Sequence, residues 1–231
     1  MFSKQTYIGR RQQLMKDVED GLILFIGNSE SPMNYLDNTY RFRQDSSFLY
    51  FFGLNHPDLI GVLDVESGEE TLYGNDYTID HIVWMGNQPT IKDRALTCGI
   101  NNTEPTSSLM HDLQDAISTG RQIHFLPAYR GESKIKLFEY LGVFPEKVQE
   151  EASNEMIKAV IKQRNYKTAE EVTEIEKAAN ITVDMHLASM RMTRPGMTEA
   201  QIAAEVERIA LAANGSISFP VIATINGQTL H

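Results

Sequence analysis

The sequence predicts an α/β protein in which a first domain with a mixed β-sheet, residues 1–153, precedes a mostly helical region, residues 154–231. In the first part, short apolar runs bounded by glycine or proline alternate with segments of helical periodicity, as strands interleaved with helices do. The second part begins with a charged helical connector and continues into two long segments with helix-capping signals. No repeat or low-complexity tract interrupts this order. We therefore place a single domain boundary, near Ser153.

The strands expected in the first domain are short apolar runs next to turn residues. They are residues 22–26, residues 59–65 and 70–73 as a hairpin around Ser67-Gly68, and residues 122–126. The consecutive aromatic residues of 48–52 are expected to form a further strand, covered on both faces. Residues 81–85 fit either a short strand or a helix end.

Helices are expected where apolar residues recur every three or four positions. In the first domain these are residues 7–18, 109–117 and 135–141, and residues 147–167 form the charged connector. Beyond the connector, Thr168 precedes Glu171 by three positions, which is the spacing of a capping box that starts a helix. Arg194-Pro195-Gly196 ends that helix, because proline cannot continue it and glycine tolerates the reversed backbone.

Thr198 and Gln201 repeat the capping pattern and start a second amphipathic helix that Asn214-Gly215 ends. The β-rich run 218–225 then predicts a strand, with a hairpin turn at Asn226-Gly227. Both helices carry an apolar face suited to packing on another layer. If that face is left exposed, we expect it to drive self-association or disorder of the tail.

Composition restricts the classes of partner. Apolar residues make up 42% and charged residues 23% of 231 residues, which are ordinary values for a folded protein. The net charge of −10 weighs against a nucleic-acid backbone or an anionic membrane and fits peptides and metal ions. Cys98 is the only cysteine, so no internal disulfide can form. With no signal-peptide pattern at the start, the expected location is the cytoplasm.

No complete catalytic or metal-binding motif is present in the sequence. The histidines are scattered without metal-ligand spacing, at His56, His81, His111, His124, His186 and His231. There is no nucleophile-elbow or phosphate-loop pattern. By itself, this chain is expected to be inactive as an enzyme.

Three blocks in the second region carry a resemblance. They are the stretch around Arg164 and Lys167-Thr-Ala-Glu-Glu-Val172, then Arg194-Pro-Gly-Met-Thr-Glu-Ala200, then Phe219-Pro220 with Asn226-Gly227 and Leu230-His231. Together they resemble the start of the catalytic domain of the creatinase, prolidase and aminopeptidase P family. Residues 40–53 and Val83-Trp-Met-Gly86 resemble the N-terminal domain of aminopeptidase P.

The resemblance implies a creatinase-like N-terminal domain followed by the first helices and strand of a pita-bread (α+β) catalytic domain. It implies an Xaa-Pro aminopeptidase, a manganese enzyme with two ions, acting on proline-containing peptides as a homodimer or higher homo-oligomer. In the family, all five metal ligands (two aspartates, a histidine and two glutamates) follow the position of His231. This chain would therefore hold no metal and would serve subunit assembly and shaping of the substrate cleft.

The resemblance also indicates individual residues. His231 matches a histidine that faces the substrate near the metals. Trp84 matches a tryptophan at the oligomer interface that reaches toward a neighbouring substrate cleft, and Arg41 and Arg43 would line the cleft entrance or a subunit contact. The residues alone also allow Arg41 and Arg43 to form a structural polar network with Gln44 and Asp45.

Three alternatives stay open at this point. A prolidase, which cuts only dipeptides, shares the architecture. A pseudo-peptidase would keep the fold to bind peptides or a protein without metal. A structural oligomerisation module would need neither metal nor substrate.

Overall fold

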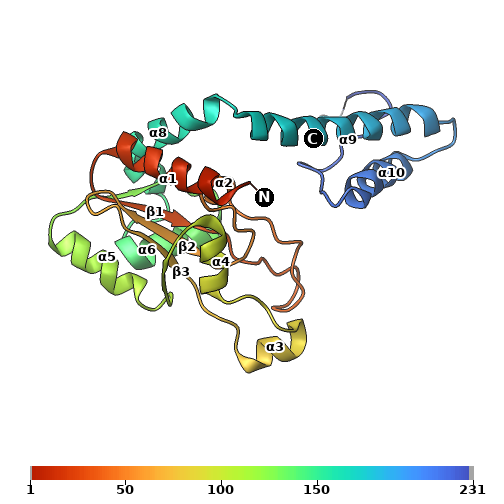
Figure 1. Ribbon diagram of the computed structural model, residues 1–231. Helices are drawn as coiled ribbons and strands as arrows, with labels where there is room; N and C mark the ends of the chain where they lie inside the picture. Colours follow the sequence, from red (N-terminus) through yellow and green to blue (C-terminus); the bar gives the residue numbers. More distant parts are fainter. Residues whose placement is uncertain (1, 229–231) are drawn as a thin grey trace. The chain divides into compact units, whose positions relative to one another are not determined.

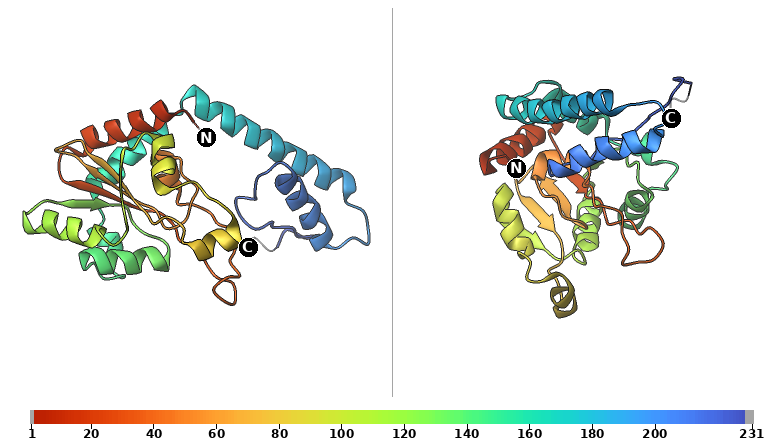
Figure 2. Two further views of the ribbon diagram at one scale, coloured as in Figure 1. Left: turned by 60° about the horizontal axis from the view of Figure 1, so that its bottom comes forward. Right: turned by 90° about the vertical axis from the view of Figure 1, so that its right-hand side faces the viewer.

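The computed structural model describes residues 2–228, and the chain divides into two compact units, Met1–Tyr166 and Lys167–His231 (Figure 1). The first unit is a sheet with helices on both faces (Figure 2). The second is a pair of helices followed by an irregular segment. Each unit has its own internal packing.

The sheet of the first unit has five strands in the order β4-β3-β2-β1-β5. Their bounds are β1 (Leu22–Ile26), β2 (Ile60–Asp64), β3 (Glu70–Tyr73), β4 (Asn102–Glu104) and β5 (Ile123–Phe125). β2 pairs antiparallel with both β1 and β3, whereas β1–β5 and β3–β4 are parallel pairs. The mixed sheet and the hairpin around Gly68 confirm the fold class predicted from the sequence.

Alternate side chains of each strand are buried on opposite faces of the sheet, because successive side chains of a strand point to opposite sides. Ile23 and Phe25 of β1 pack with one group of helices, and Leu22 and Leu24 pack with the other. The first group comprises α1 (Lys4–Val18), α2 (Ser46–Phe52), α4 (Ile91–Cys98) and α8 (Asn154–Asn165). The second comprises α5 (Leu109–Ser118), α6 (Gly131–Leu141) and α7 (Val148–Glu151).

The aromatic run 48–52 lies in helix α2, so the strand expected there is wrong. Asp45 begins the helix, and its side chain accepts hydrogen bonds from the backbone N–H groups of Ser47 and Phe48 at 2.9 Å each. Helical spacing puts the fully buried Phe48, Phe51 and Phe52 on one face and leaves Leu49 41% exposed. One core therefore accepts the aromatic rings from a single side, which a strand with alternating faces would not allow.

Helix α3 (Ile79–Met85) resolves the ambiguity at residues 81–85 in favour of a helix. It has no buried residue, so tertiary packing contributes little to its position. Thr78 and His81 form a capping box at its start. Sequence periodicity did not predict α4 or the polar edge strand β4.

The connector ends in α8, which packs on α1 and contributes Met156, Ala159 and Val160 to the buried core. The compact units therefore divide later in the chain than the domain boundary expected near Ser153. Ser153 itself caps α8 by accepting a hydrogen bond from the Met156 N–H at 3.1 Å.

The second unit contains α9 (Ala169–Met192) and α10 (Glu199–Ala212), which pack against each other. Both capping boxes predicted for them, Thr168 with Glu171 and Thr198 with Gln201, are formed. Residues 216–228 contain no strand, so the strand expected at 218–225 is wrong for the part described. A strand exists only as part of a ladder, and this segment pairs with no other strand of the described chain. Residues 229–231, including His231, lie outside the described residues.

Helix α9 has no buried residue, although its sequence is apolar on two faces. Ile181 and Met185 line the α10 side together with Val206. The opposite side carries Val172 and Met190, which are 42% and 71% exposed. A helix with apolar residues on both faces is adapted to contact two layers. No helix of the described chain is both long enough and apolar enough to cross a bilayer.

Candidate functional site

The site residues indicated by the sequence lie on the surface of the first unit or outside the described residues. Trp84 is 88% exposed on α3. Arg41 and Arg43 are exposed on the segment before α2, where the Arg43 carbonyl accepts a hydrogen bond from Asn28 Nδ2 at 2.8 Å. Arg43 thus takes part in a polar contact through its backbone.

Gln44 and Asp45, which the sequence placed in a structural polar network, hold neighbouring loops together. The buried Gln44 side chain accepts from the Asn28 N–H at 2.7 Å and donates to the His56 carbonyl at 2.8 Å. Asp45 caps α2. These contacts hold the segment that carries Arg41 and Arg43 against the end of β1.

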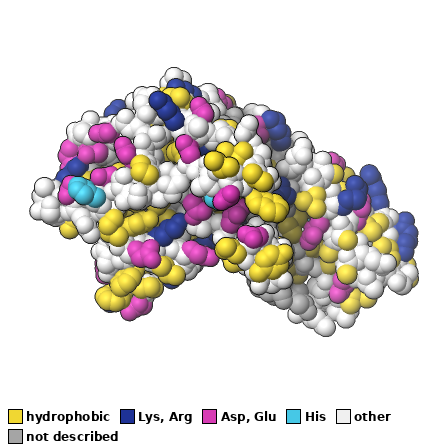
Figure 3. Space-filling model, turned by 90° about the horizontal axis from the view of Figure 1, so that it is seen from below, with side chains coloured by type: hydrophobic (Ala, Val, Ile, Leu, Met, Phe, Trp, Pro, Cys, Tyr) yellow, Lys and Arg dark blue, Asp and Glu magenta, His cyan; other side chains and the backbone are white. Residues whose placement is uncertain are grey.

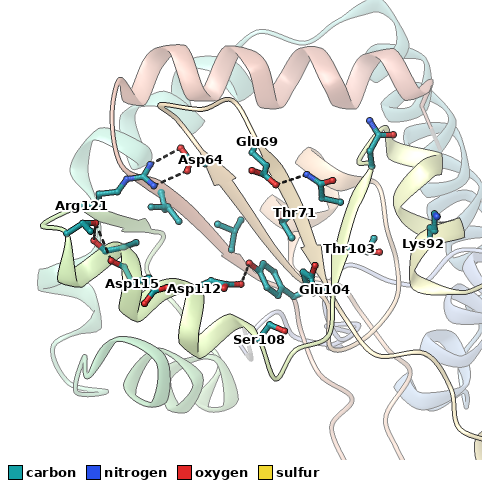
Figure 4. A pocket seen from close by; sticks show the side chains of 17 residues that line it. Asp64, Glu69, Thr71, Lys92, Thr103, Glu104, Ser108, Asp112, Asp115 and Arg121 are labelled. Atoms are coloured by element: carbon teal, nitrogen blue, oxygen red, sulfur yellow. Dashed lines mark hydrogen bonds and ion pairs between the residues drawn. The ribbon is translucent and has the colours of Figure 1, made fainter.

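The first unit also has an open groove of about 950 Å³ above β3 and β4, which the sequence analysis did not identify (Figure 4). One wall is α5, which contributes Asp112 and Asp115, together with Ser108 just before it. The floor is the sheet, where Thr71 and Tyr73 of β3 lie beside Asn102 and Glu104 of β4. The groove exists because α5 and the helices behind it cover Tyr73 of β3 but leave Asn102 and Glu104 of β4 exposed.

Hydrogen bonds hold the polar groups of the groove in place. The Tyr73 hydroxyl donates to Asp112 Oδ2 at 2.7 Å, and burial together with this carboxylate raises the pKa of Tyr73. Asn102 Nδ2 donates to Glu69 Oε1 at 2.7 Å. Tyr73 therefore stays protonated, and the two carboxylates stay at defined positions along the groove.

At one end of the groove, Arg121 binds Asp64 through both of its terminal nitrogens, at 2.9 and 2.7 Å, and also pairs with Glu66. The Arg121 guanidinium is the main reason that the pKa of Asp64 falls to about 2. Two carboxylates around one guanidinium leave a net negative charge there. Figure 3, from the side where α3 lies in Figure 1, shows acidic and hydrophobic side chains interspersed on the surface.

The described residues do not fit a metal centre. Nowhere in residues 2–228 do three histidine, cysteine, aspartate or glutamate side chains come together at a spacing suited to a metal ion. No reaction step through a metal can be derived from the residues that the structure describes.

Comparison with known proteins gives a consistent result along the chain. A sequence profile described as the N-terminal domain of aminopeptidase P matches residues 7–124, and one described as metallopeptidase family M24 matches residues 173–231. The Xaa-Pro aminopeptidase of Escherichia coli (strain K12) is 23% identical over 220 residues, which cover 88% of this chain and 48% of that protein. The Xaa-Pro dipeptidase of Homo sapiens is 36% identical over 70 residues, 30% of this chain and 14% of that protein.

Solved structures show the same fold. Escherichia coli aminopeptidase P with the inhibitor Pro-Leu superposes with a TM-score of 0.74 at 21% identity, covering 92% of this chain and 50% of that one. Pseudomonas aeruginosa aminopeptidase PepP gives a TM-score of 0.73 at 22% identity, covering 92% of this chain and 50% of that one. The chain thus spans about half, or less, of the length of the relatives it matches.

Proposed function

The chain belongs to the aminopeptidase P family, and on that premise we propose that it is the N-terminal part of a two-metal Xaa-Pro aminopeptidase. The complete enzyme would release the first residue from peptides whose second residue is proline. Within it, this chain would serve subunit assembly and shape the substrate cleft.

The observation that carries the proposal is the order of the two profile matches on one chain. The first unit matches the aminopeptidase P N-terminal domain, and the match to the metallopeptidase family begins at residue 173, inside α9. A relative named for Xaa-Pro aminopeptidase activity aligns across both units.

Hydrolysis of an Xaa-Pro bond needs groups that the described residues do not supply. An Xaa-Pro bond is a tertiary amide without an N–H, and it needs an activated water for hydrolysis. Two bound metal ions, manganese in our proposal, would lower the pKa of that water and stabilise the developing oxyanion. Since residues 2–228 hold no suitable ligand cluster, we assign the ligands to sequence beyond this chain.

Within this chain, we assign His231 to the substrate site of the complete enzyme. We assign Trp84, with its exposed ring on α3, to a subunit contact near the cleft, and Arg41 and Arg43 to the cleft entrance or the same contact. If Trp84 touches the peptide beyond the proline, Trp84→Ala in the complete enzyme raises KM for longer peptides. Unchanged KM would remove this assignment.

A second candidate, a prolidase that cuts only dipeptides, is supported by the match to human Xaa-Pro dipeptidase. The two activities differ in how far the cleft extends past the scissile bond. A complete enzyme that cleaves Xaa-Pro dipeptides but not longer Xaa-Pro peptides would establish the prolidase instead.

The experiment that tests the proposal is an activity assay on the complete gene product with manganese. We expect release of the N-terminal residue from a tripeptide with proline second and no release from the matched tripeptide with alanine second. Cleavage of both substrates, or of neither after metal loading, would overturn the proposal. His231→Ala should lower kcat/KM while leaving manganese content unchanged, which separates a substrate contact from a metal ligand.

A further inference from the structure

We propose that the groove above β3 and β4 is a docking site for a basic, extended peptide segment of a partner protein. The groove belongs to the first unit, and the proposal does not depend on the peptidase activity. Three observations support it: the exposed outer strand of the sheet, the size of the groove, and its charge.

The exposed part of the sheet is its outer strand, β4. β4 is the outermost strand and pairs only with β3 in the described chain. Because paired residues of neighbouring strands face the same side, Asn102 and Glu104 continue the surface formed by Thr71 and Tyr73. On this face β1, β2 and Tyr73 of β3 contribute to the buried core with α5, whereas Asn102 and Glu104 of β4 are exposed.

The groove is open to solvent and has a volume of about 950 Å³. Its floor mixes the Tyr73 ring, the Thr71 hydroxyl and the apolar Val62. An extended peptide presents side chains alternately to the two sides, so every second side chain would enter the groove. A peptide lying beside β4 could also use the outer backbone groups of this edge strand.

Its charge selects a cationic occupant. Five acidic side chains line the groove, namely Asp64, Glu69, Glu104, Asp112 and Asp115. Opposed to them are Lys92 and Arg121, and Arg121 is already shared by two carboxylates. The carboxylates are spread out and do not converge on one point, consistent with the absence of a three-ligand metal cluster in residues 2–228. Arginine side chains at alternate positions of a peptide match this spread, since each guanidinium can bind one carboxylate in a bidentate manner.

The test uses the purified chain and a fluorescently labelled short peptide that alternates arginine and threonine. We expect binding by fluorescence anisotropy with a Kd on the order of 10–100 µM at low salt, because the interface is small and open. Affinity should fall as salt is raised, since the contacts are exposed charge pairs. The same peptide with glutamate in place of arginine should not bind.

The variant that probes the groove combines Glu104→Gln with Asp115→Asn, two exposed groups that the fold does not require. This variant should raise the Kd of the arginine peptide about tenfold, because two charge contacts of about 0.7 kcal/mol each are lost. The matched control is Glu139→Gln on α6, an exposed carboxylate outside the groove, which should change Kd less than about twofold. Thr71→Lys, which places a cation on the groove floor, should abolish binding while circular dichroism confirms the fold.

Equal weakening by the control variant would overturn the proposal, because it would show attraction to overall negative charge. Binding that survives Thr71→Lys in a folded protein would overturn it too. If spermine displaces the peptide at an equal concentration, the groove takes simple cations and the assignment to a peptide fails.

Discussion

Replacing the buried Arg11 with methionine should destabilise the first unit severely. Arg11 is 0% exposed, and its guanidinium joins three parts of the fold. It donates to the Phe51 carbonyl at 2.9 Å, to the Cys98 carbonyl at 2.9 Å and to Glu70 Oε2 at 2.8 Å. It therefore links α1 to the ends of α2 and α4 and to the start of β3.

The magnitude follows from what the substitution leaves behind. Methionine keeps the apolar stem of Arg11 but leaves two carbonyls and the Glu70 carboxylate without their donor. Removing one partner of a buried ion pair costs about 3–5 kcal/mol. The Glu70 side chain is 14% exposed, so water recovers part of the loss, and Arg11 Nε is already buried without a partner. We expect about 4 kcal/mol, a large share of the roughly 5–15 kcal/mol that stabilises a domain.

The assay is urea unfolding of the chain, followed by near-ultraviolet circular dichroism of the aromatic cluster around α2. A loss of about 4 kcal/mol lowers the midpoint by roughly 2 M urea with an unchanged slope. The matched control, Lys147→Met, breaks the exposed pair with Glu150 and should cost less than about 0.5 kcal/mol. If Arg11→Met costs under about 1 kcal/mol, the guanidinium does not hold these elements together and the reasoning is wrong.

Three further predictions concern single groups. The pKa of Asp64 is held at about 2 in the folded chain against 3.8 when free, so its stabilisation is complete above pH 4 and is lost as pH falls through 2. After allowance for solvent screening, the lowered pKa of Asp64 contributes about 1 kcal/mol to the free energy of unfolding. Arg121→Gln should therefore raise the pH of acid unfolding, and an unchanged acid midpoint would show that the pair contributes nothing. Burial raises the pKa of the Cys98 thiol, so iodoacetamide at pH 8 should modify it slowly in the folded chain and quickly in urea. Equal rates would contradict its burial. Asp45→Ala should lower the free energy of unfolding in urea by about 1 kcal/mol, because the α2 cap is lost. Asp45→Asn should keep most of that stability, because the asparagine side chain can cap the helix as well.

The sequence predicts the elements whose signals are local. The capping boxes at Thr168 and Thr198 and the apolar run of β1 depend on neighbouring residues, and the structure confirms them. The aromatic run 48–52 shows the limit of such reasoning. Consecutive aromatic residues favour a strand by propensity, but the Asp45 cap and burial on one side make the segment helical.

The groove could not be predicted because its parts are distant in the chain and ordinary one by one. Asp64, Glu104 and Asp112 come from different strands and a helix, and each resembles a solvated surface acid when taken alone. The pairing of β3 with β2 and β4 and the packing of α5 on the sheet bring them to one surface, and β4 has no apolar pattern that would predict a strand. The exposure of Trp84 likewise depends on α3 having no buried residue, which periodicity did not reveal.

The most direct test of the central claim is a manganese titration of this purified chain by calorimetry, with an Xaa-Pro peptide assay on the same sample. In our proposal the metal ligands of the peptidase lie in sequence beyond residue 231, so we expect neither tight manganese binding nor release of the N-terminal residue. Tight binding of manganese, or cleavage of the peptide by this chain alone, would contradict it.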